Sequence, residues 1–350
     1  MIEYFQHFGA KVSAEDLKNF AQSPNWDGKI FKNTSKTSIA IGAKELPSLL
    51  YKQFFDKAGR KPSSPIIIKP FDKEAFLDST DEPKAVWFGH SVILLRINGL
   101  TILCDPMFGP DTAPIAPFPS KRYSDNTLAL IDDLPPIDLV LLTHDHYDHL
   151  DLQSIKKIHP NVEHFYVALG TARHLKKWGV NPAKITEFDW WQSHNFKDLA
   201  ITFTPTRHFS GRGLSDRAKS LWGGWAIKSG THSIYISGDS GIDEHFKEVG
   251  ERLGPFDFGF VECGQYNPLW HAIHMFPEES VQVAQLVELK RAMPIHWGAF
   301  TLSLHSWTEP VERFIKAAEA VNQAYITPEI GSLFSLKTPT KTTNWWEKYQ

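Results

Sequence analysis

The run Leu139–Leu150 constrains this chain more than any other stretch, because four apolar residues lead directly into His144, His146, Asp148 and His149. Imidazole nitrogen and carboxylate oxygen are the ligands that borderline divalent cations prefer. In an extended or looped segment, alternate side chains point in different directions, so one short loop can offer ligands to two ions. The run therefore predicts a two-metal site.

An accidental cluster is the alternative, since the chain has 16 histidines in 350 residues. An arrangement of this kind is nevertheless expected only about 0.002 times in a chain of this length. Three further candidate ligands, His208, Asp239 and His296, each follow a β-like apolar run. In open α/β sheets, sites form beyond the carboxyl ends of strands, so these ends can meet in one crevice. A lone His or Asp there is usually structural, but their shared placement favours metal ligation.

The stretch before the motif predicts a β-hairpin. Two β-rich runs, 86–97 and 100–104, flank Asn98-Gly99, which is a strong hairpin signal. The second run ends at Asp105. This residue is either a plain turn residue or a carboxylate that accepts a hydrogen bond from a metal-bound imidazole or its loop.

Helical spacing predicts helices over 14–20 and 46–55. Asp151 is suited to cap a helix that runs through Ile158, and a helix over 171–178 should end at Gly179.

A loop rich in Pro and polar residues spans 109–125 and carries Lys121 and Arg122. These two cations are either a solvated pair or contacts for an anionic group of the substrate.

The length fits one large α/β domain with appendages, or two modest domains. Residues 1–80 carry no chemical motif and are expected to form an arm or cap, with a small domain as the alternative. The main domain is expected over 81–335 and a tail over 336–350.

The net charge of −3 argues against nucleic acid as a partner. Cys104 and Cys263 are too few for a disulfide framework, which predicts a cytoplasmic, reducing location with both thiols buried. No apolar stretch reaches about 18 residues, so no membrane span is expected. Peripheral membrane contact stays open: the 12 tryptophans suit an interfacial surface or a hydrophobic substrate, although most tryptophan in a protein of this size is core.

Thr143–Asp151 resembles the hallmark Thr-His-x-His-x-Asp-His-Leu-Asp of the metallo-β-lactamase fold superfamily. Asp105, His208, Asp239 and His296 match the early Asp, the third-motif His, the bridging Asp and the last His of that superfamily. The resemblance implies an α/β fold of the αββα type, a four-layer sandwich in which two mixed sheets pack face to face with helices outside.

Residues 84–335 most resemble the branch of phospholipases D that hydrolyse N-acylphosphatidylethanolamine. The matching stretches are Trp87–Ser91, Asp105–Phe108, Leu134–Asp138, Leu221–Trp225, Gly254–Asp257, His274 with Pro277–Glu279, and Ile295–Gly298. Lys121-Arg122 falls where the branch has a Pro-Lys-Arg run, and Phe276 stands where the branch commonly has an acidic residue. Residues 1–80 match poorly; in the branch, such a segment contributes to membrane and lipid contact.

The resemblance implies two divalent cations, zinc by analogy, with manganese or iron also compatible with the donors. One ion would be held by His144, His146 and His208, the other by Asp148, His149 and His296, with Asp239 bridging and His90 and Asp105 supporting the ligands. Asp148 and His274 are the implied catalytic residues.

The implied reaction is phospholipase D cleavage of N-acylphosphatidylethanolamine or a related phospholipid, with hydroxide from a water shared by the ions attacking phosphorus. A lactonase or phosphoesterase acting on a small phosphorylated sugar acid is the alternative. A non-enzymatic metal-binding or nucleic-acid-binding protein is a third hypothesis, which the slightly acidic charge disfavours. A homodimer is compatible with the sequence.

Overall fold

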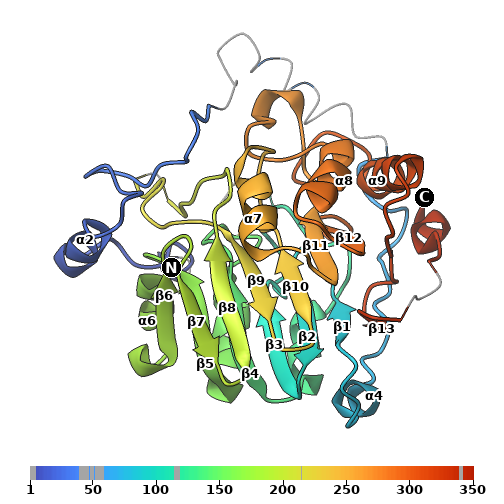
Figure 1. The fold of residues 1–350 in the computed structure, drawn as a ribbon, viewed down its shortest axis with the longest axis horizontal. Coiled ribbons are helices and arrows are strands. Elements are labelled where there is room, and N and C mark those ends of the chain that lie inside the picture. Colours follow the sequence, from blue (N-terminus) through green and yellow to red (C-terminus); the bar gives the residue numbers. More distant parts are fainter. Residues whose placement is uncertain are drawn as a thin grey trace.

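The computed structural model describes residues 5–38, 47, 51, 59–113, 119–213, 215–338 and 342–350. Within these residues the strands form two mixed sheets (Figure 1). The first sheet has the order β13 (Leu333–Ser335), β1 (Lys84–Trp87), β2 (Ile93–Ile97), β3 (Leu100–Cys104), β4 (Ile137–Leu142), β5 (Val162–Ala168), β6 (Ile185–Phe188). The second has the order β12 (Ala292–Ile295), β11 (Phe258–Glu262), β10 (Ser233–Ile236), β9 (Gly224–Lys228), β8 (Leu199–Thr204), β7 (Ser193–Phe196).

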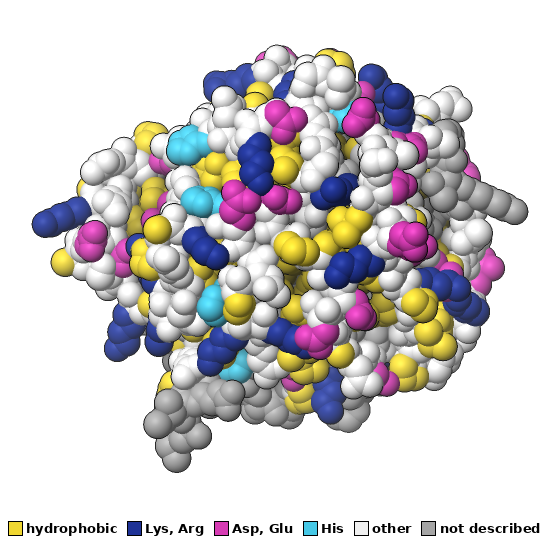
Figure 2. All heavy atoms as spheres, turned by 90° about the horizontal axis from the view of Figure 1, so that it is seen from below, with side chains coloured by type: hydrophobic (Ala, Val, Ile, Leu, Met, Phe, Trp, Pro, Cys, Tyr) yellow, Lys and Arg dark blue, Asp and Glu magenta, His cyan; other side chains and the backbone are white. Residues whose placement is uncertain are grey.

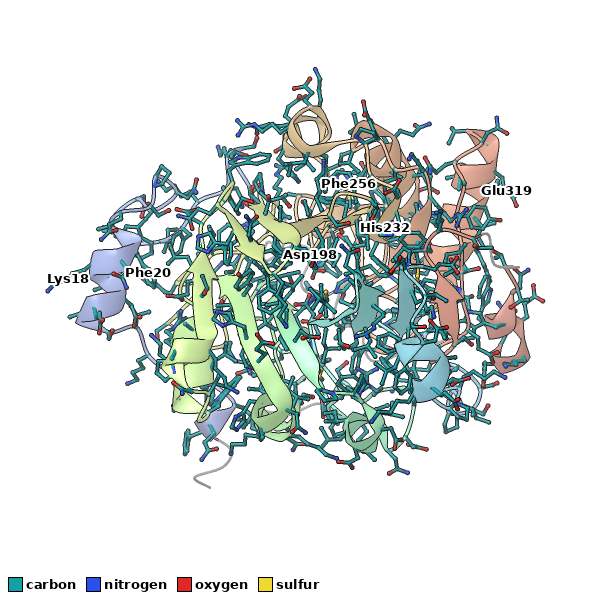
Figure 3. All side chains as sticks on the ribbon, turned by 60° about the horizontal axis from the view of Figure 1, so that its bottom comes forward. Lys18, Phe20, Asp198, His232, Phe256 and Glu319 are labelled. Atoms are coloured by element: carbon teal, nitrogen blue, oxygen red, sulfur yellow. The ribbon has the colours of Figure 1, made fainter. Side chains whose placement is uncertain are left out.

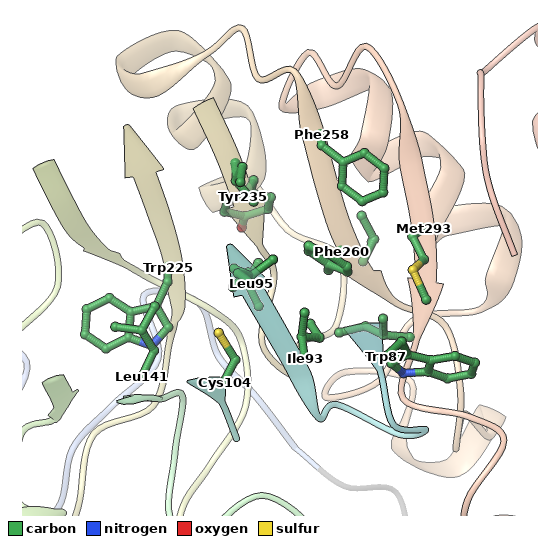
Figure 4. Close-up of a cluster of buried hydrophobic side chains, with 14 of the residues drawn as sticks. Trp87, Ile93, Leu95, Cys104, Leu141, Trp225, Tyr235, Phe258, Phe260 and Met293 are labelled. Carbon is green, nitrogen blue, oxygen red and sulfur yellow. The ribbon is translucent and has the colours of Figure 1, made fainter. Parts of the chain in front are cut away.

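Central strands of the first sheet are apolar on both faces because each face packs against a different core. On β4, Leu139 and Leu141 belong to the core between the sheets, whereas Val140 and Leu142 belong to a second cluster. Successive side chains of a strand point to opposite faces, so a strand buried on both sides needs a continuous apolar run. Figure 4 shows side chains of both sheets in the core between them.

Helices cover the outer faces of both sheets (Figure 1). The second cluster joins the first sheet to α5 (Leu152–Ile158) and α6 (Ala172–Lys177). On the other side, α8 (Pro277–Leu286) contacts β11 and β12 and lies between α7 (His245–Leu253) and α9 (Glu309–Ala320). The αββα sandwich implied by the resemblance is therefore confirmed.

Several local predictions are confirmed. Helix α2 spans Ala14–Phe20, the Asp151 side chain accepts a hydrogen bond from Ser154 N at the start of α5, and Gly179 has φ 99° just after α6. Asn98 and Gly99 have positive φ and connect β2 to β3 as a hairpin. The helix predicted over 46–55 lies outside the described residues, apart from positions 47 and 51.

The single β-rich run predicted over 86–97 is wrong, because it contains two strands, β1 and β2. Between them Gly89 and His90 have φ of 84° and 54°, and Phe88 N donates to Val92 O. This turn is itself buried and interrupts the apolar run only at Gly89, His90 and Ser91, between the apolar residues Phe88 and Val92. Hydrophobic pattern alone could not locate the turn.

Most of the tryptophans belong to the core, as is usual in a protein of this size, and peripheral membrane contact stays a prediction. Nine are buried and the other three, Trp26, Trp191 and Trp270, are partly buried. Trp297 lies 5.5 Å from Trp345, ring centroid to centroid. Because Trp345 lies in the 3₁₀ helix η5 (Trp345–Tyr349), the end of the chain is packed into the main body.

The described parts of residues 1–80 also pack onto the main body. Helix α2 begins with a capping box between Ser13 and Asp16, and it points Phe20 inward and Lys18 outward (Figure 3). Phe20 joins the hydrophobic cluster that contains the core between the sheets, and Phe76 of α4 (Lys73–Leu77) joins the outer cluster of the first sheet. The division into arm, main domain and tail stays a prediction.

The face shown in Figure 2 is mixed in charge, with basic and acidic side chains interspersed among scattered apolar groups. Among the described helices, none combines the length and the apolar character needed to cross a bilayer.

Candidate metal centre

The candidate ligands meet because the strands that precede them end at the same edge. Strands β3 and β4 are parallel, which places Asp105 beside the start of the motif loop at Thr143. Strands β10, β11 and β12 are also parallel, so Asp239 after β10 and His296 after β12 leave the sheet in the same direction, with β11 between them. The two sheets are joined there by a hydrogen bond from Gly223 N to Thr143 O, 3.1 Å long.

Three imidazoles form the first group. His146 Nδ1 lies 3.0 Å from His144 Nε2 and 3.2 Å from His208 Nε2. Nitrogens bound to one zinc at about 2.0–2.1 Å lie roughly 3.3 Å apart in a tetrahedral site. His208 Nδ1 lies 3.1 Å from the carbonyl of Ile273, so it carries the proton and leaves the Nε2 lone pair facing the group.

The second group of candidate ligands lies around the carboxylate of Asp148. Asp148 Oδ2 lies 3.2 Å from His296 Nε2, 3.5 Å from His149 Nε2 and 2.8 Å from His90 Nε2. His90 therefore lies against the carboxylate as the sequence suggested. Burial, followed by the charge of His296, lowers the pKa of His90 to about 3, so a neutral ring donates Nε2–H to Asp148.

Asp105 hydrogen-bonds to the motif loop and to His149, a ligand of this second group. Its carboxylate accepts hydrogen bonds from Thr143 N (2.8 Å) and Thr143 Oγ1 (2.6 Å), and Oδ2 lies 2.8 Å from His149 Nδ1. The contact expected for Asp105 is thus present. With Nδ1–H directed at a buried carboxylate, Nε2 is the nitrogen of His149 that a metal ion would bind.

Asp239 lies between the two groups. Its Oδ2 is 3.1 Å from His149 Nε2 and 3.2 Å from His296 Nε2, and 3.8 Å from both His144 Nε2 and His208 Nε2. Its Oδ1 is buried and has no hydrogen-bond partner in the described part of the chain. A buried carboxylate oxygen without a partner, surrounded by imidazole nitrogens, fits a divalent cation.

The protonation of the two groups differs. Burial and the neighbouring imidazoles hold the pKa of His144 and His208 well below its ordinary value. Burial opposes protonation of His296 too, but Asp239 and Asp148 outweigh it and raise the pKa of His296 to about 10. Protons therefore offset the carboxylate charges, and a bound cation would replace them, so metal binding should release protons.

A cavity of about 320 Å³ opens onto both groups. Its lining residues are His146, Asp148, His208, Phe209, Asp239, Gln265, Trp270, Ile273, His274, His296 and Leu302. His274 Nδ1 lies 3.3 Å from Glu262 Oε1, which leaves Nε2 to face the cavity. The ring of Phe276 instead packs on Tyr266, 5.3 Å away between centroids, and Phe276 is not among the lining residues.

The expectation that Arg122 contacts substrate is wrong. The side chain is buried, and its guanidinium donates to the carbonyls of Phe88, Met107 and Gly109, so it holds three loop segments together. Sequence shows that a cation lies in a loop but does not show which way it points. Lys121 is exposed and does not line the cavity; a substrate role for it stays a prediction.

Sequence reasoning missed two buried carboxylates beside the motif. Glu262 ends β11 and accepts from Met275 N and Ser240 N as well as contacting His274. It follows an apolar run just as the candidate ligands do, so the same rule could have found it. Asp145 lies between two motif histidines and accepts from Ser220 Oγ, 2.6 Å away; its position gave no signal.

Residues 101–297 match the model of a family described as the beta-lactamase superfamily domain. The chain belongs to the metallo-β-lactamase superfamily. Among superfamily relatives, an N-acyl-phosphatidylethanolamine-hydrolyzing phospholipase D of Caenorhabditis elegans is 30% identical over 91% of each chain. An uncharacterized protein of Mycobacterium tuberculosis is 34% identical over 93% of this chain and 88% of its own.

Two solved structures share the fold. A metallo hydrolase of Ignicoccus hospitalis matches with a TM-score of 0.55 at 20% identity, over 74% of this chain and 99% of its own. A diiron β-hydroxylase of Streptomyces venezuelae matches with a TM-score of 0.54 at 16% identity, over 73% of this chain and 54% of its own. Membership supports a metal-dependent hydrolase; the number and identity of the metals stay predictions.

Proposed function

We propose that this protein is a phosphodiesterase of the phospholipase D type that cleaves N-acylphosphatidylethanolamine or a related phospholipid. The observation that carries the proposal is the position of Asp239 Oδ2 within 3.8 Å of four imidazole nitrogens, between two ligand groups at one cavity. The relative from Caenorhabditis elegans, which covers almost the whole chain, supports the substrate class.

Each ligand group would hold one divalent cation, zinc in the first instance, with Asp239 shared between the two. Bound cations at such a site supply Lewis-acid chemistry, because they polarise a phosphoryl oxygen and lower the pKa of water towards neutrality. The protein's own groups orient the ligand side chains. Asp105 and Ile273 O fix which nitrogens of His149 and His208 carry protons, so that the ligand lone pairs stay directed into the site.

His274 is placed to handle the substrate rather than to support a ligand from behind. Its ring centroid lies 5.0 Å from that of His208 and 5.2 Å from that of His296, so it lies beside both groups. Glu262 orients the ring through Nδ1, and Nε2 can donate a hydrogen bond to a phosphoryl oxygen or to the leaving oxygen.

The cavity walls suit the apolar portion of a lipid. Phe209, Trp270, Ile273 and Leu302 are among its lining residues, and Leu302 is 37% exposed. Ligand sites commonly combine such apolar walls with a few convergent polar groups. A glycerol or acyl segment next to the phosphodiester would contact these side chains.

The proposal is tested with N-acylphosphatidylethanolamine in mixed micelles. Zinc-loaded wild type should release phosphatidic acid and N-acylethanolamine, and Asp239→Ala should release neither while it retains the fold by circular dichroism. If wild type binds close to two ions per chain and yet releases no product, the lipid substrate is wrong, and soluble phosphoesters and lactones become the substrates to test.

A small phosphorylated substrate is the second candidate. It is favoured by a groove beside His208 whose lining includes the cations Lys32, Lys36 and Arg217 and several hydroxyl side chains.

A further inference from the structure

A second groove, of about 370 Å³, meets the cavity at the metal centre. The two share His208, Phe209 and Ile273 as lining residues. The rest of the groove is formed by Arg217, Trp222 and the segment 30–37 of the N-terminal arm. A segment that matches the superfamily's motifs poorly thus forms a wall next to a candidate ligand.

This arm segment is fixed to the backbone of His208. Asn33 Nδ2 donates to His208 O (2.8 Å), and His208 N donates to Asn33 Oδ1 (3.1 Å). Trp222 Nε1 donates to the same Oδ1, and Arg207 Nε donates to Thr37 Oγ1 (3.1 Å). Side-chain hydrogen bonds therefore hold the two walls of the groove, the 30–37 segment and the segments around His208 and Trp222, in a fixed arrangement.

Two cations face this groove without an acidic partner. The guanidinium of Arg217 stacks over the ring of Phe209, 4.0 Å from its centroid, and Phe209 in turn lies 4.5 Å from the ring of His146. Within the described residues, neither Arg217 nor Lys36 has a carboxylate within 4 Å, whereas Lys32 pairs with Asp27 at 2.9 Å. A guanidinium placed over an aromatic ring can still direct N–H groups at a bidentate anion.

We propose that this groove binds a second anionic group, of phosphate or carboxylate chemistry, while the reacting group of the substrate lies at the metal centre. Arg217 and Lys36 are its specificity-determining residues, and the hydroxyl of Thr34 adds a hydrogen bond. The inference rests on the proposed function only in placing the reacting group at the metal centre. It assigns to Arg217 and Lys36 the role that the buried Arg122 cannot fill.

The anion has two possible sources with the same chemistry. It is either a second charged group of the substrate itself or the headgroup of a neighbouring anionic lipid. A soluble probe detects the first source, and vesicles detect the second. Both measurements are equilibrium binding, so neither depends on turnover of N-acylphosphatidylethanolamine.

The soluble measurement is calorimetry of the zinc-loaded protein with 1,3-propanediol bisphosphate and, for comparison, propyl phosphate. Wild type should bind the bisphosphate about tenfold more tightly, as expected for charge-assisted contacts to a second anion. Arg217→Gln and Lys36→Gln should each reduce this preference roughly three- to tenfold, and Arg217→Lys should retain part of it. Lys18→Gln, on exposed α2 outside the groove, is the matched control and should change nothing.

The vesicle measurement is co-sedimentation with phosphatidylcholine alone or mixed with phosphatidylglycerol. A gain in binding with phosphatidylglycerol that Arg217→Gln and Lys36→Gln remove, without a preference for the soluble bisphosphate, supports the site and assigns the anion to a neighbouring lipid. The inference is overturned if both substitutions leave both measurements at the wild-type value. Bisphosphate preference without release from N-acylphosphatidylethanolamine supports the groove and refutes the lipid substrate alone.

Discussion

Replacing Asp105 by Asn tests whether second-layer hydrogen bonding sets the metal affinity. Asp105 is 2% exposed and its carboxylate contacts Thr143 N, Thr143 Oγ1 and His149 Nδ1. Asn has the same shape but only one acceptor oxygen. If that oxygen keeps the bond from Thr143 N, the amide NH₂ group faces the Thr143 hydroxyl and the imidazole.

The Thr143 hydroxyl can rotate to accept, but His149 can accept at Nδ1 only by moving its proton to Nε2. Nε2 is the nitrogen that lies 3.1 Å from Asp239 Oδ2 in the second ligand group, and a protonated nitrogen cannot bind a metal. Loss of an outer partner of this kind weakens metal binding about 10- to 100-fold, or roughly 1.4–2.8 kcal/mol. The free energy of unfolding should fall by about 2 kcal/mol through the lost charged hydrogen bonds.

Competition with a chromogenic chelator measures the zinc affinity, and urea unfolding measures stability. Asp138→Asn is the matched control, because Asp138 lies near the opposite end of β4 and bonds Thr101 N and Lys197 Nζ. Zinc affinity of Asp105→Asn equal to that of Asp138→Asn would refute the tautomer argument.

Three further substitutions check other parts of the structure. Asp239→Ala should lower phosphodiester hydrolysis and metal content more than 100-fold, since outer partners alone are worth about 10- to 100-fold; near-normal hydrolysis in metal-free buffer would contradict the scheme. Arg122→Met should cost roughly 3 kcal/mol of unfolding free energy, because it leaves buried carbonyls unpaired, whereas Lys121→Met should be nearly neutral; equal urea midpoints would show that Arg122 is not structural. Gly9→Ala should loosen the N-terminal arm by roughly 1–3 kcal/mol, because Gly9 has φ 70° and a Cβ there would lie 1.8 Å from His174 Nδ1; unchanged limited proteolysis of the arm would oppose this.

The metal motif could be predicted in detail because its ligands are neighbours in sequence. His144, His146, Asp148 and His149 lie in one loop, so their proximity requires no tertiary contact. The helix caps and the Asn98-Gly99 turn were equally local, since each depends on hydrogen bonds and dihedral angles within a few residues.

The order of the strands determines how the remaining candidate ligands come together at the metal centre. Sequence showed that His208, Asp239 and His296 follow strands, but only the parallel pairing of β10, β11 and β12 brings Asp239 and His296 to one edge, with Glu262 between them. Such pairing joins residues far apart in the chain, and hydrophobic periodicity carries no information about which strands are neighbours.

The sequence by itself determined the superfamily, the strand-and-loop character of the ligand segments and the type of chemistry. Only the tertiary structure decided where the cations and aromatic rings lie: Arg122 in the body, nine of the twelve tryptophans in the core, and Arg217 and Lys36 at the groove beside His208. The physical reason is that a side chain's direction and burial depend on what packs against it, and those partners come from distant parts of the chain.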